Sequence, residues 1–284
     1  MGNCESLNIF TSSSSSKPSS SSSSPALDSV TPRQRALLIG INYLGQAGEL
    51  RGCANDVLHM WRYLRDVRGV RDVVVLSDGI PDEGWDADMQ VESPTREALL
   101  RELGALVGWA RAGDRCWFHY SGHGGKLADA GEDEADGFDE CLFPVDFRQE
   151  GIVKDDHIQT CIKRLHPEAT FVGVIDACHS GTMLDLAHTY VPGNKGPNIL
   201  KNHYPQIFSI SGCRDDQTSA DALLQGRWGG ALTTMLLRLL EENRDFTCRE
   251  LHAALHANLE VRYLKQRPQL QASAPLRDGT VVPI

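Results

Sequence analysis

Short apolar runs alternate with amphipathic helical segments along the chain from residue 35 onward. The strand-like runs are 35–43, 72–78, 115–124, 170–176, 206–213 and a last short one at 269–272. The helical segments are 53–67, 93–113, about 155–165, 229–243 and 247–260. In the second of these, Ser93 is the expected N-cap and Pro94 the first helical residue. Alternation of this kind predicts an α/β fold, in which a mostly parallel central sheet is flanked by helices on both faces.

The first 32 residues differ in composition and are predicted to be a disordered tether. The stretch TSSSSSKPSSSSSSP has no large apolar residue, so it cannot bury enough surface to offset the entropy cost of ordering. Before it, MGNCES matches the M-G-x-x-x-[ST] signal, which predicts myristoylation of Gly2, and the adjacent Cys4 could carry palmitate. Two acyl chains would anchor the protein stably on a membrane surface. The alternative is a chance match in a short tail.

The amino-acid composition limits where in the cell the protein is expected and which classes of ligand it is expected to bind. The 284 residues include 28 basic and 38 acidic side chains, and the formal net charge of −10 argues against a general nucleic-acid binder and favours cationic ligands. No apolar run has the length of a transmembrane helix, and no secretory signal is recognisable. The 8 cysteines form no CxxC pair and are predicted to be reduced thiols in a cytoplasmic protein. The acylation signal predicts that this protein associates with a membrane through its N-terminus.

Two polar motifs follow predicted strands. HYSGHGGK places His123 just after one strand, and DACHSG places Cys178 just after another. Carboxyl ends of parallel strands meet at one sheet edge, where ligand sites lie. An imidazole beside a thiol activates it as a nucleophile and can later protonate the leaving amine, while the N–H groups of Gly124 and Cys178 are candidate oxyanion donors. Singly, His123 would be read as structural and Cys178 as a core thiol; together they predict a catalytic pair.

YSGHG followed by DACHSG resembles the metacaspases, cysteine peptidases of the caspase–haemoglobinase fold that are associated with programmed cell death. The segments GCANDV, DGFDECLFPVD, DDH and SGCRDDQTSADA also look like metacaspase segments, in family order. The resemblance implies one peptidase domain over 33–284, with a catalytic part at about 33–190 and a smaller part at about 203–284, as in type I members. The serine-rich tether departs from the proline/glutamine-rich or zinc-finger prodomain of many type I members.

The resemblance also implies cleavage after Arg or Lys, whereas caspases cleave after Asp. The positions that match the family's substrate pocket are Cys53, Asp56, Ser121 and Asp176. A recessed pair of carboxylates would bind a guanidinium or an ammonium group, so the expected partners are proteins or peptides with Arg or Lys at the cleaved bond. For Asp56, the alternative is an acid that only stabilises the N-terminus of its helix.

The acidic stretch ADAGEDEADGFDECLFPVDF suggests a cation site but is not an EF-hand. With Gly137 at the sixth loop position, the twelfth position is Phe143 and not Glu. The resemblance implies instead a Ca²⁺ site built from separate segments, with the ligands Asp139, Asp155, Asp156 and Asp185. Calcium would order the loop beside the active site and switch the peptidase on. A solvated acidic rim is the alternative, and it is the preferred interpretation for residues 132–134.

The sequence therefore predicts a calcium-dependent cysteine endopeptidase that forms an acyl-enzyme and, like its family, acts as a monomer. One alternative is a membrane-tethered scaffold whose function does not depend on proteolysis, and another is a related peptidase with Asp specificity. Lys195 and Lys201 lie in a polar connection and are either self-cleavage sites or solvated linker residues.

Overall fold

The structure is a computed structural model that describes Met1 and residues 32–128, 138–178, 183–190, 206–212, 221–224, 226–262, 267–276 and 279–281. Pro32–Ile284 is one compact unit and Met1–Thr31 another. The predicted acylation sites, Gly2 and Cys4, lie outside the described residues, as do Lys195 and Lys201. Of the helices that the structure describes, none combines the length and apolarity needed to cross a membrane.

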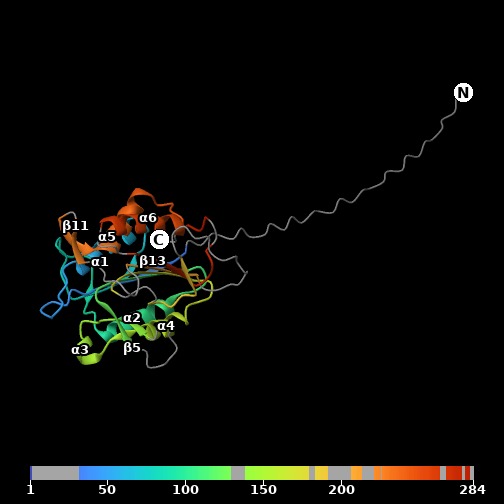
Figure 1. Cartoon of the computed structure of the whole chain (residues 1–284). Helices are drawn as coiled ribbons and strands as arrows, with labels where there is room; N and C mark the ends of the chain where they lie inside the picture. Colours follow the sequence, from blue (N-terminus) through green and yellow to red (C-terminus); the bar gives the residue numbers. More distant parts are fainter. Residues whose placement is uncertain are drawn as a thin grey trace. The chain divides into compact units, whose positions relative to one another are not determined.

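Within the described ranges, the central sheet has eight strands (Figure 1). In spatial order they are β3 (Val91–Glu92), β2 (Asp72–Ser77), β1 (Gln34–Gly40), β4 (Arg115–Ser121), β8 (Thr170–Asp176), β10 (Gln206–Ser211), β13 (Gln269–Ala272) and β9 (His188–Tyr190). The strands from β3 to β10 run parallel, and β13 pairs antiparallel with both β10 and β9. The predicted α/β fold with a mostly parallel sheet is confirmed.

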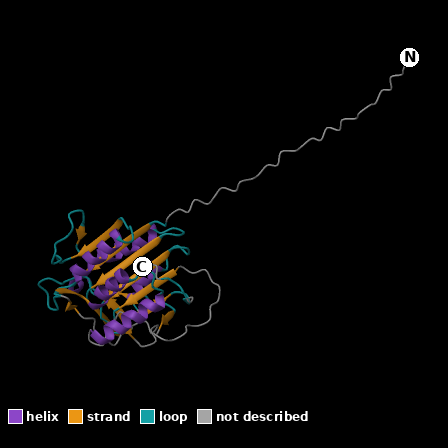
Figure 2. Cartoon of the chain, turned by 90° about the horizontal axis from the view of Figure 1, so that it is seen from above, coloured by secondary structure: helices purple, strands orange, loops and turns teal. Residues whose placement is uncertain are grey.

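Helices cover both faces of this sheet (Figures 1 and 2). One face carries α1 (Cys53–Asp66), α5 (Ala231–Glu242) and α6 (Cys248–Arg262), and the other carries α2 (Arg96–Trp109) and α4 (Asp155–Ile162). In α1, the positions selected by helical spacing are buried: Val57, Leu58, Trp61 and Leu64. Each face thus has its own apolar core, and burial of these side chains holds the helices on the sheet.

The start of α2 differs from the prediction. The helix begins at Arg96, and the Thr95 hydroxyl caps it by accepting a hydrogen bond from the N–H of Ala98 at 3.2 Å. Ser93 is therefore not the N-cap, and Pro94 precedes the helix. A threonine at this position satisfies one of the N–H groups that a helix leaves unpaired at its start.

Smaller antiparallel sheets occupy two stretches that were predicted differently. Part of the acidic loop forms β6 (Phe138–Leu142), which pairs with β5 (Gly124–Ala128), the strand just before the loop, and with β7 (Val153–Lys154), ahead of α4. A four-residue helix, α3 (Phe147–Glu150), lies between β6 and β7 along the chain. The start of the helix predicted at 229 is instead strand β12 (Arg227–Gly230), which pairs with β11 (Asp221–Leu224). In β6 the buried Glu140 pairs with Lys126 at 3.5 Å. A buried charged residue interrupts the apolar pattern by which strands are recognised in a sequence, so β6 was not predicted.

Candidate active site

The predicted catalytic residues lie at the carboxyl ends of neighbouring parallel strands. His123 follows β4 and Cys178 follows β8, and Ser121 is the register partner of Asp176 where these strands end. Just beyond, the N–H of Gly122 donates to the carbonyl oxygen of Asp176 at 3.3 Å. The segments that carry the histidine and the cysteine therefore leave the sheet side by side.

Gly124 brings these two segments into contact. A Cβ atom on Gly124 would collide with the carbonyl oxygen of Cys178, so a residue with a side chain does not fit here. In the β5–β6 ladder, Gly124 is opposite Leu142. The adjacent pair is a bonded one, because the N–H of Phe143 donates to the carbonyl of His123 at 3.3 Å. Since bonded and non-bonded pairs alternate in antiparallel sheets, the N–H of Gly124 points away from β6.

A backbone carbonyl orients the His123 ring. Its Nε2 lies 2.6 Å from the carbonyl oxygen of Gly48. A carbonyl oxygen only accepts, so Nε2 carries the proton, and Nδ1 is left as the acceptor of the neutral ring. Gly48 has a φ of 87°, and a Cβ atom there would lie 3.1 Å from Nε2. The half-buried ring is thus presented as a base through Nδ1.

Three of the four predicted pocket residues meet above the end of β4. The Ser121 hydroxyl donates to Oδ2 of Asp56 at 2.6 Å, and Asp176 points to the same face because it is the register partner of Ser121. Asp56 and Asp176 are only 1% and 3% exposed. The fourth, Cys53, is buried one turn earlier in α1. This helix approaches the sheet closely at Gly40, where a Cβ atom would collide with the Cys53 carbonyl oxygen.

Both carboxylates also bind the first turn of α5. The N–H of Gly230 donates to Oδ1 and Oδ2 of Asp56 at 3.0 and 2.9 Å, and the N–H of Thr233 donates to Oδ2 of Asp176 at 2.8 Å. Such amides have no partner within their own helix, and the positive end of the helix dipole favours a negative charge beside them. A Cβ atom on Gly230 would collide with Asp176. Asp56 therefore lies at the N-termini of two helices: it is in the first turn of α1, as the alternative interpretation assumed, and it also binds the N-terminus of α5.

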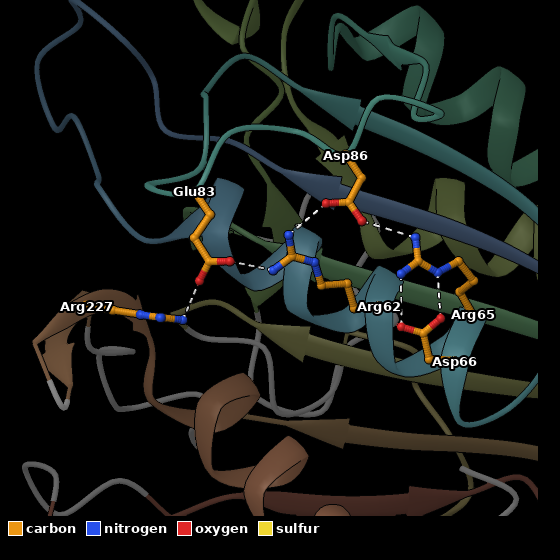
Figure 3. Close-up of polar contacts among 6 residues, drawn as sticks. All are labelled: Arg62, Arg65, Asp66, Glu83, Asp86 and Arg227. Atoms are coloured by element: carbon orange, nitrogen blue, oxygen red, sulfur yellow. Dashed lines mark hydrogen bonds and ion pairs between the residues drawn. The ribbon is translucent and has the colours of Figure 1, made fainter.

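Strand β12, which leads into α5, is attached to α1 and to the loop at 78–90. Asn55 donates through Nδ2 to the carbonyl oxygen of Trp228 at 2.7 Å. Glu83 pairs with Arg227 of β12 at 2.5 Å and with Arg62 of α1 at 2.6 Å (Figure 3). The row of alternating charges continues through Asp86, Arg65 and Asp66. Partly exposed ion pairs contribute little to stability singly, but together they fix where β12 lies against α1.

The predicted Ca²⁺ ligands come from β6, the start of α4 and the segment before β9. Asp155, 3% exposed, accepts the N–H of Glu140 at 3.0 Å and the N–H of Asp156 at 2.8 Å. The side-chain amide of Gln159 donates to Asp185, which ties that residue to α4. The backbone of Asp139 lies in β6 beside Glu140, but its side chain is not described. Among the described side chains, no group of three or more His, Cys, Asp or Glu residues is placed to hold a metal ion.

Sequence reasoning missed several residues of this site. The strand-end rule that selected His123 and Cys178 also applies to Tyr43, which follows β1 and contacts the His123 ring at 4.6 Å between ring centroids. Gly230 and Thr233 carry no motif and reach the pocket acids only through packing of distant segments, so no local signal identifies them.

A cysteine and an oriented histidine at the ends of adjacent strands of an α/β sheet are the parts of a cysteine-type peptidase. The family model for "Metacaspase, peptidase C14 domain" matches residues 34–187. Metacaspase-1 of Sclerotinia sclerotiorum is 35% identical over 297 residues, which cover 87% of this chain and 67% of the relative. Metacaspase-1B of Neurospora crassa is 36% identical over 295 residues, covering 86% and 67%. The chain belongs to the metacaspase family and is a cysteine-type peptidase, as the sequence motifs predicted.

Solved structures with a similar fold include the crystal structure of a protein from Geobacter sulfurreducens, with a TM-score of 0.60 and 24% sequence identity over 88% of this chain and 100% of that chain. At this level of identity the likeness concerns the fold alone, and it agrees with the α/β architecture described above.

Proposed function

We propose that this metacaspase is a calcium-dependent, monomeric endopeptidase that cleaves protein chains after Arg or Lys, with Cys178 as nucleophile and His123 as general base and acid. The observation that carries the catalytic assignment is the packing of Gly124 against the Cys178 carbonyl, directly beside a histidine whose Nδ1 is left as a proton acceptor. A thiol, an imidazole and an outward-facing amide at one sheet edge support this assignment.

In the acylation half, Nδ1 of His123 takes the proton of the Cys178 thiol. The thiolate attacks the carbonyl carbon of the peptide bond, and the N–H groups of Gly124 and Cys178 stabilise the oxyanion. The imidazolium then gives its proton to the departing amine nitrogen, so the C–N bond breaks and a thioester remains. The bond from Nε2–H to the Gly48 carbonyl persists through both protonation states, because the imidazolium donates from both ring nitrogens.

In the second half, a water molecule replaces the amine. His123 takes a proton from this water as it attacks the thioester carbonyl, and the second tetrahedral intermediate collapses to a carboxylic acid and a thiolate. The proton returns from the imidazolium to Cys178, so the enzyme is regenerated.

The pocket acids support the preference for Arg or Lys. Asp56 and Asp176 are buried together at the site, and their bonds from Ser121 and from the α5 amides come from neutral donors. Neutral donors orient a carboxylate without cancelling its charge, so the pair attracts a cationic side chain. Two buried carboxylates therefore favour a cationic substrate side chain over a neutral one.

A fluorogenic peptide assay tests the catalytic pair and the specificity. We expect turnover of Arg and Lys peptides, no turnover of the matched Asp peptide, and loss of activity in Cys178→Ala and His123→Ala. Faster cleavage of the Asp peptide would contradict the role of the acids. Undiminished turnover in Cys178→Ala would contradict the assignment of the nucleophile.

Calcium dependence is supported by the donor chemistry. Ca²⁺ prefers oxygen ligands, which carboxylates provide. The proposed ligands are Asp155, Asp156, Asp185 and Asp139, which precedes Glu140 in β6. Asp155 and Asp156 begin α4, Asp185 accepts a hydrogen bond from Gln159 of the same helix, and β6, which Asp155 contacts, pairs with β5, which begins at Gly124. A bound ion would reduce repulsion among these acids and stiffen the strand next to the catalytic residues. The peptidase assay in chelator, then with added Ca²⁺, tests this: full activity in chelator would exclude a calcium switch.

We also propose that Gly2 and Cys4 carry acyl chains that hold the enzyme at the cytoplasmic side of a membrane. Incorporation of a myristate analogue should be lost in Gly2→Ala. Cys4→Ser should keep that label but shift the protein from the membrane to the soluble fraction, because a single myristoyl chain binds only marginally. Equal labelling of wild type and Gly2→Ala would contradict this proposal.

A further inference from the structure

Two tyrosine hydroxyl groups hold the main chain of His123 from both sides. The hydroxyl of Tyr43 accepts the N–H of His123 at 3.0 Å. The hydroxyl of Tyr120 donates to the carbonyl oxygen of the same residue at 2.8 Å. Tyr43 follows β1 and Tyr120 is the penultimate residue of β4, so the two side chains come from adjacent parallel strands.

The shortest contacts assign the two hydroxyl protons. Each hydroxyl has a single proton; that of Tyr43 goes to the carbonyl oxygen of Phe143 at 2.7 Å, and that of Tyr120 goes to His123 at 2.8 Å, in preference to the Phe143 carbonyl oxygen at 3.3 Å. The two hydroxyl oxygens lie 3.2 Å apart and make a contact in which both protons are already used. Burial raises the pKa of both phenols well above the usual value, so both stay protonated over any working pH.

The ring of Tyr43 also supports the imidazole. The two ring centroids are 4.6 Å apart with an interplanar angle of 30°. Tyr43 has a φ of 55°, a left-handed conformation that is unusual for a residue with a side chain and persists only where its surroundings impose it. Here Asp78 imposes it, because its carboxylate accepts the N–H groups of Asn42 at 2.6 Å and Leu44 at 3.2 Å, on either side of Tyr43.

We propose that Tyr43 and Tyr120 are positioning residues of the peptidase, which hold His123 so that Nε2 stays on the Gly48 carbonyl and Nδ1 stays available to take the proton of the Cys178 thiol. The inference rests on the proposed role of His123 as the base. Neither tyrosine needs to touch the substrate. Each acts through the histidine, Tyr43 through main chain and ring and Tyr120 through main chain alone.

Three variants separate these contributions. Tyr43→Phe removes one hydroxyl and keeps the ring, Tyr43→Leu removes both, and Tyr120→Phe removes the other hydroxyl. We expect kcat to fall while KM stays within error, by about 10-fold in each Phe variant and by about 100-fold in Tyr43→Leu, since a small misplacement of a catalytic group has effects of this size. The alkylation rate of Cys178 by iodoacetamide, corrected with Cys178→Ala, should fall in the same order without any substrate present.

Tyr190→Phe is the matched control. Tyr190 lies in β9, at the edge of the sheet, and its hydroxyl accepts a hydrogen bond from the N–H of Leu276 at 2.6 Å. The variant therefore loses a buried tyrosine hydrogen bond that is remote from His123. We expect a lowered melting temperature with unchanged kcat and alkylation rate. If the two Phe variants at positions 43 and 120 behave like this control, the inference is wrong, even if Tyr43→Leu fails to fold.

The variant His123→Ala separates this inference from the proposed function. If it retains full activity and wild-type alkylation, the role of the histidine as base is itself wrong. If it is inactive while the tyrosine variants keep wild-type kcat and alkylation, only the positioning role is wrong.

Discussion

Glycines at the active site let main-chain atoms reach the functional side chains. Gly48 brings its carbonyl to the His123 ring, Gly124 packs against the Cys178 carbonyl, and Gly230 brings its N–H to a pocket acid. In each case a Cβ atom would lie within 3.1 Å of another group of the site, or overlap it. Substitution of these residues should therefore harm catalysis as strongly as substitution of a charged residue.

At the residue scale, Gly124→Ala is the sharpest test of this view. The new methyl group would displace the segment that carries His123 from the segment that carries Cys178, and we expect kcat/KM to fall by ~100-fold or more. The control is Gly104→Ala in α2, where an added Cβ meets nothing within 4 Å and helix propensity improves by up to ~1 kcal/mol. That variant should keep wild-type kinetics and melt at an equal or higher temperature. Wild-type kcat/KM in Gly124→Ala would show that the contact has no catalytic role.

At the scale of elements, the sequence was most informative where a strand is buried on both faces. The runs at 72–78 and 170–176 match β2 and β8 closely, because a continuous apolar run is a strong local signal. Strands β3, β7 and β9 have two or three residues, too few to show a period, and pairing with their neighbours stabilises them. The start of a helix is marked by a single capping side chain, and the hydroxyl groups of Ser93 and Thr95 are close in sequence, so the sequence does not separate the two positions.

The cap of α2 gives a prediction for element stability. Thr95→Ala removes the hydroxyl that accepts the N–H of Ala98, and the loss should lower the free energy of unfolding by about 1 kcal/mol. Ser93→Ala should change it by less than about half of that, since Ser93 lies outside the helix. Urea unfolding of both variants measures the difference, and kcat should be unchanged in both. A larger destabilisation by Ser93→Ala would return the cap to the position that the sequence first suggested.

For the whole molecule, one part of the site follows from sequence and another does not. That His123 and Cys178 would lie at the same sheet edge was predictable, because carboxyl ends of parallel strands share an edge. The bond between Asp56 and Gly230 joins residues 174 positions apart. It exists because α1 and α5 pack side by side on one face of the sheet, and nothing in the sequence specifies that adjacency. The pocket acids could be proposed only by resemblance, and their contact with α5 only from the structure.

Acid sensitivity is a property of the whole molecule to which one buried histidine should contribute strongly. His119 lies in β4 with Nε2 3.1 Å from the Thr233 hydroxyl, and burial lowers its pKa from 6.5 to about 3. Protonation is opposed further because its buried Nδ1 has no hydrogen-bond partner among the described residues. The unfolded chain therefore binds a proton at this residue between about pH 6.5 and 3, while the folded chain does not.

It follows that the free energy of unfolding should be unaffected by His119 titration above about pH 6.5 and should fall with decreasing pH below it, by ~1 kcal/mol per pH unit for this group. His119→Gln keeps a polar group beside Thr233 but cannot titrate. Urea unfolding at about pH 8, 6 and 5 should show a shallower acid slope in the variant than in the wild type, with parallel curves at the alkaline end. Equal slopes at all three values would mean that His119 is protonated as easily in the folded chain as in the unfolded one, and that the core beneath α5 is open to water.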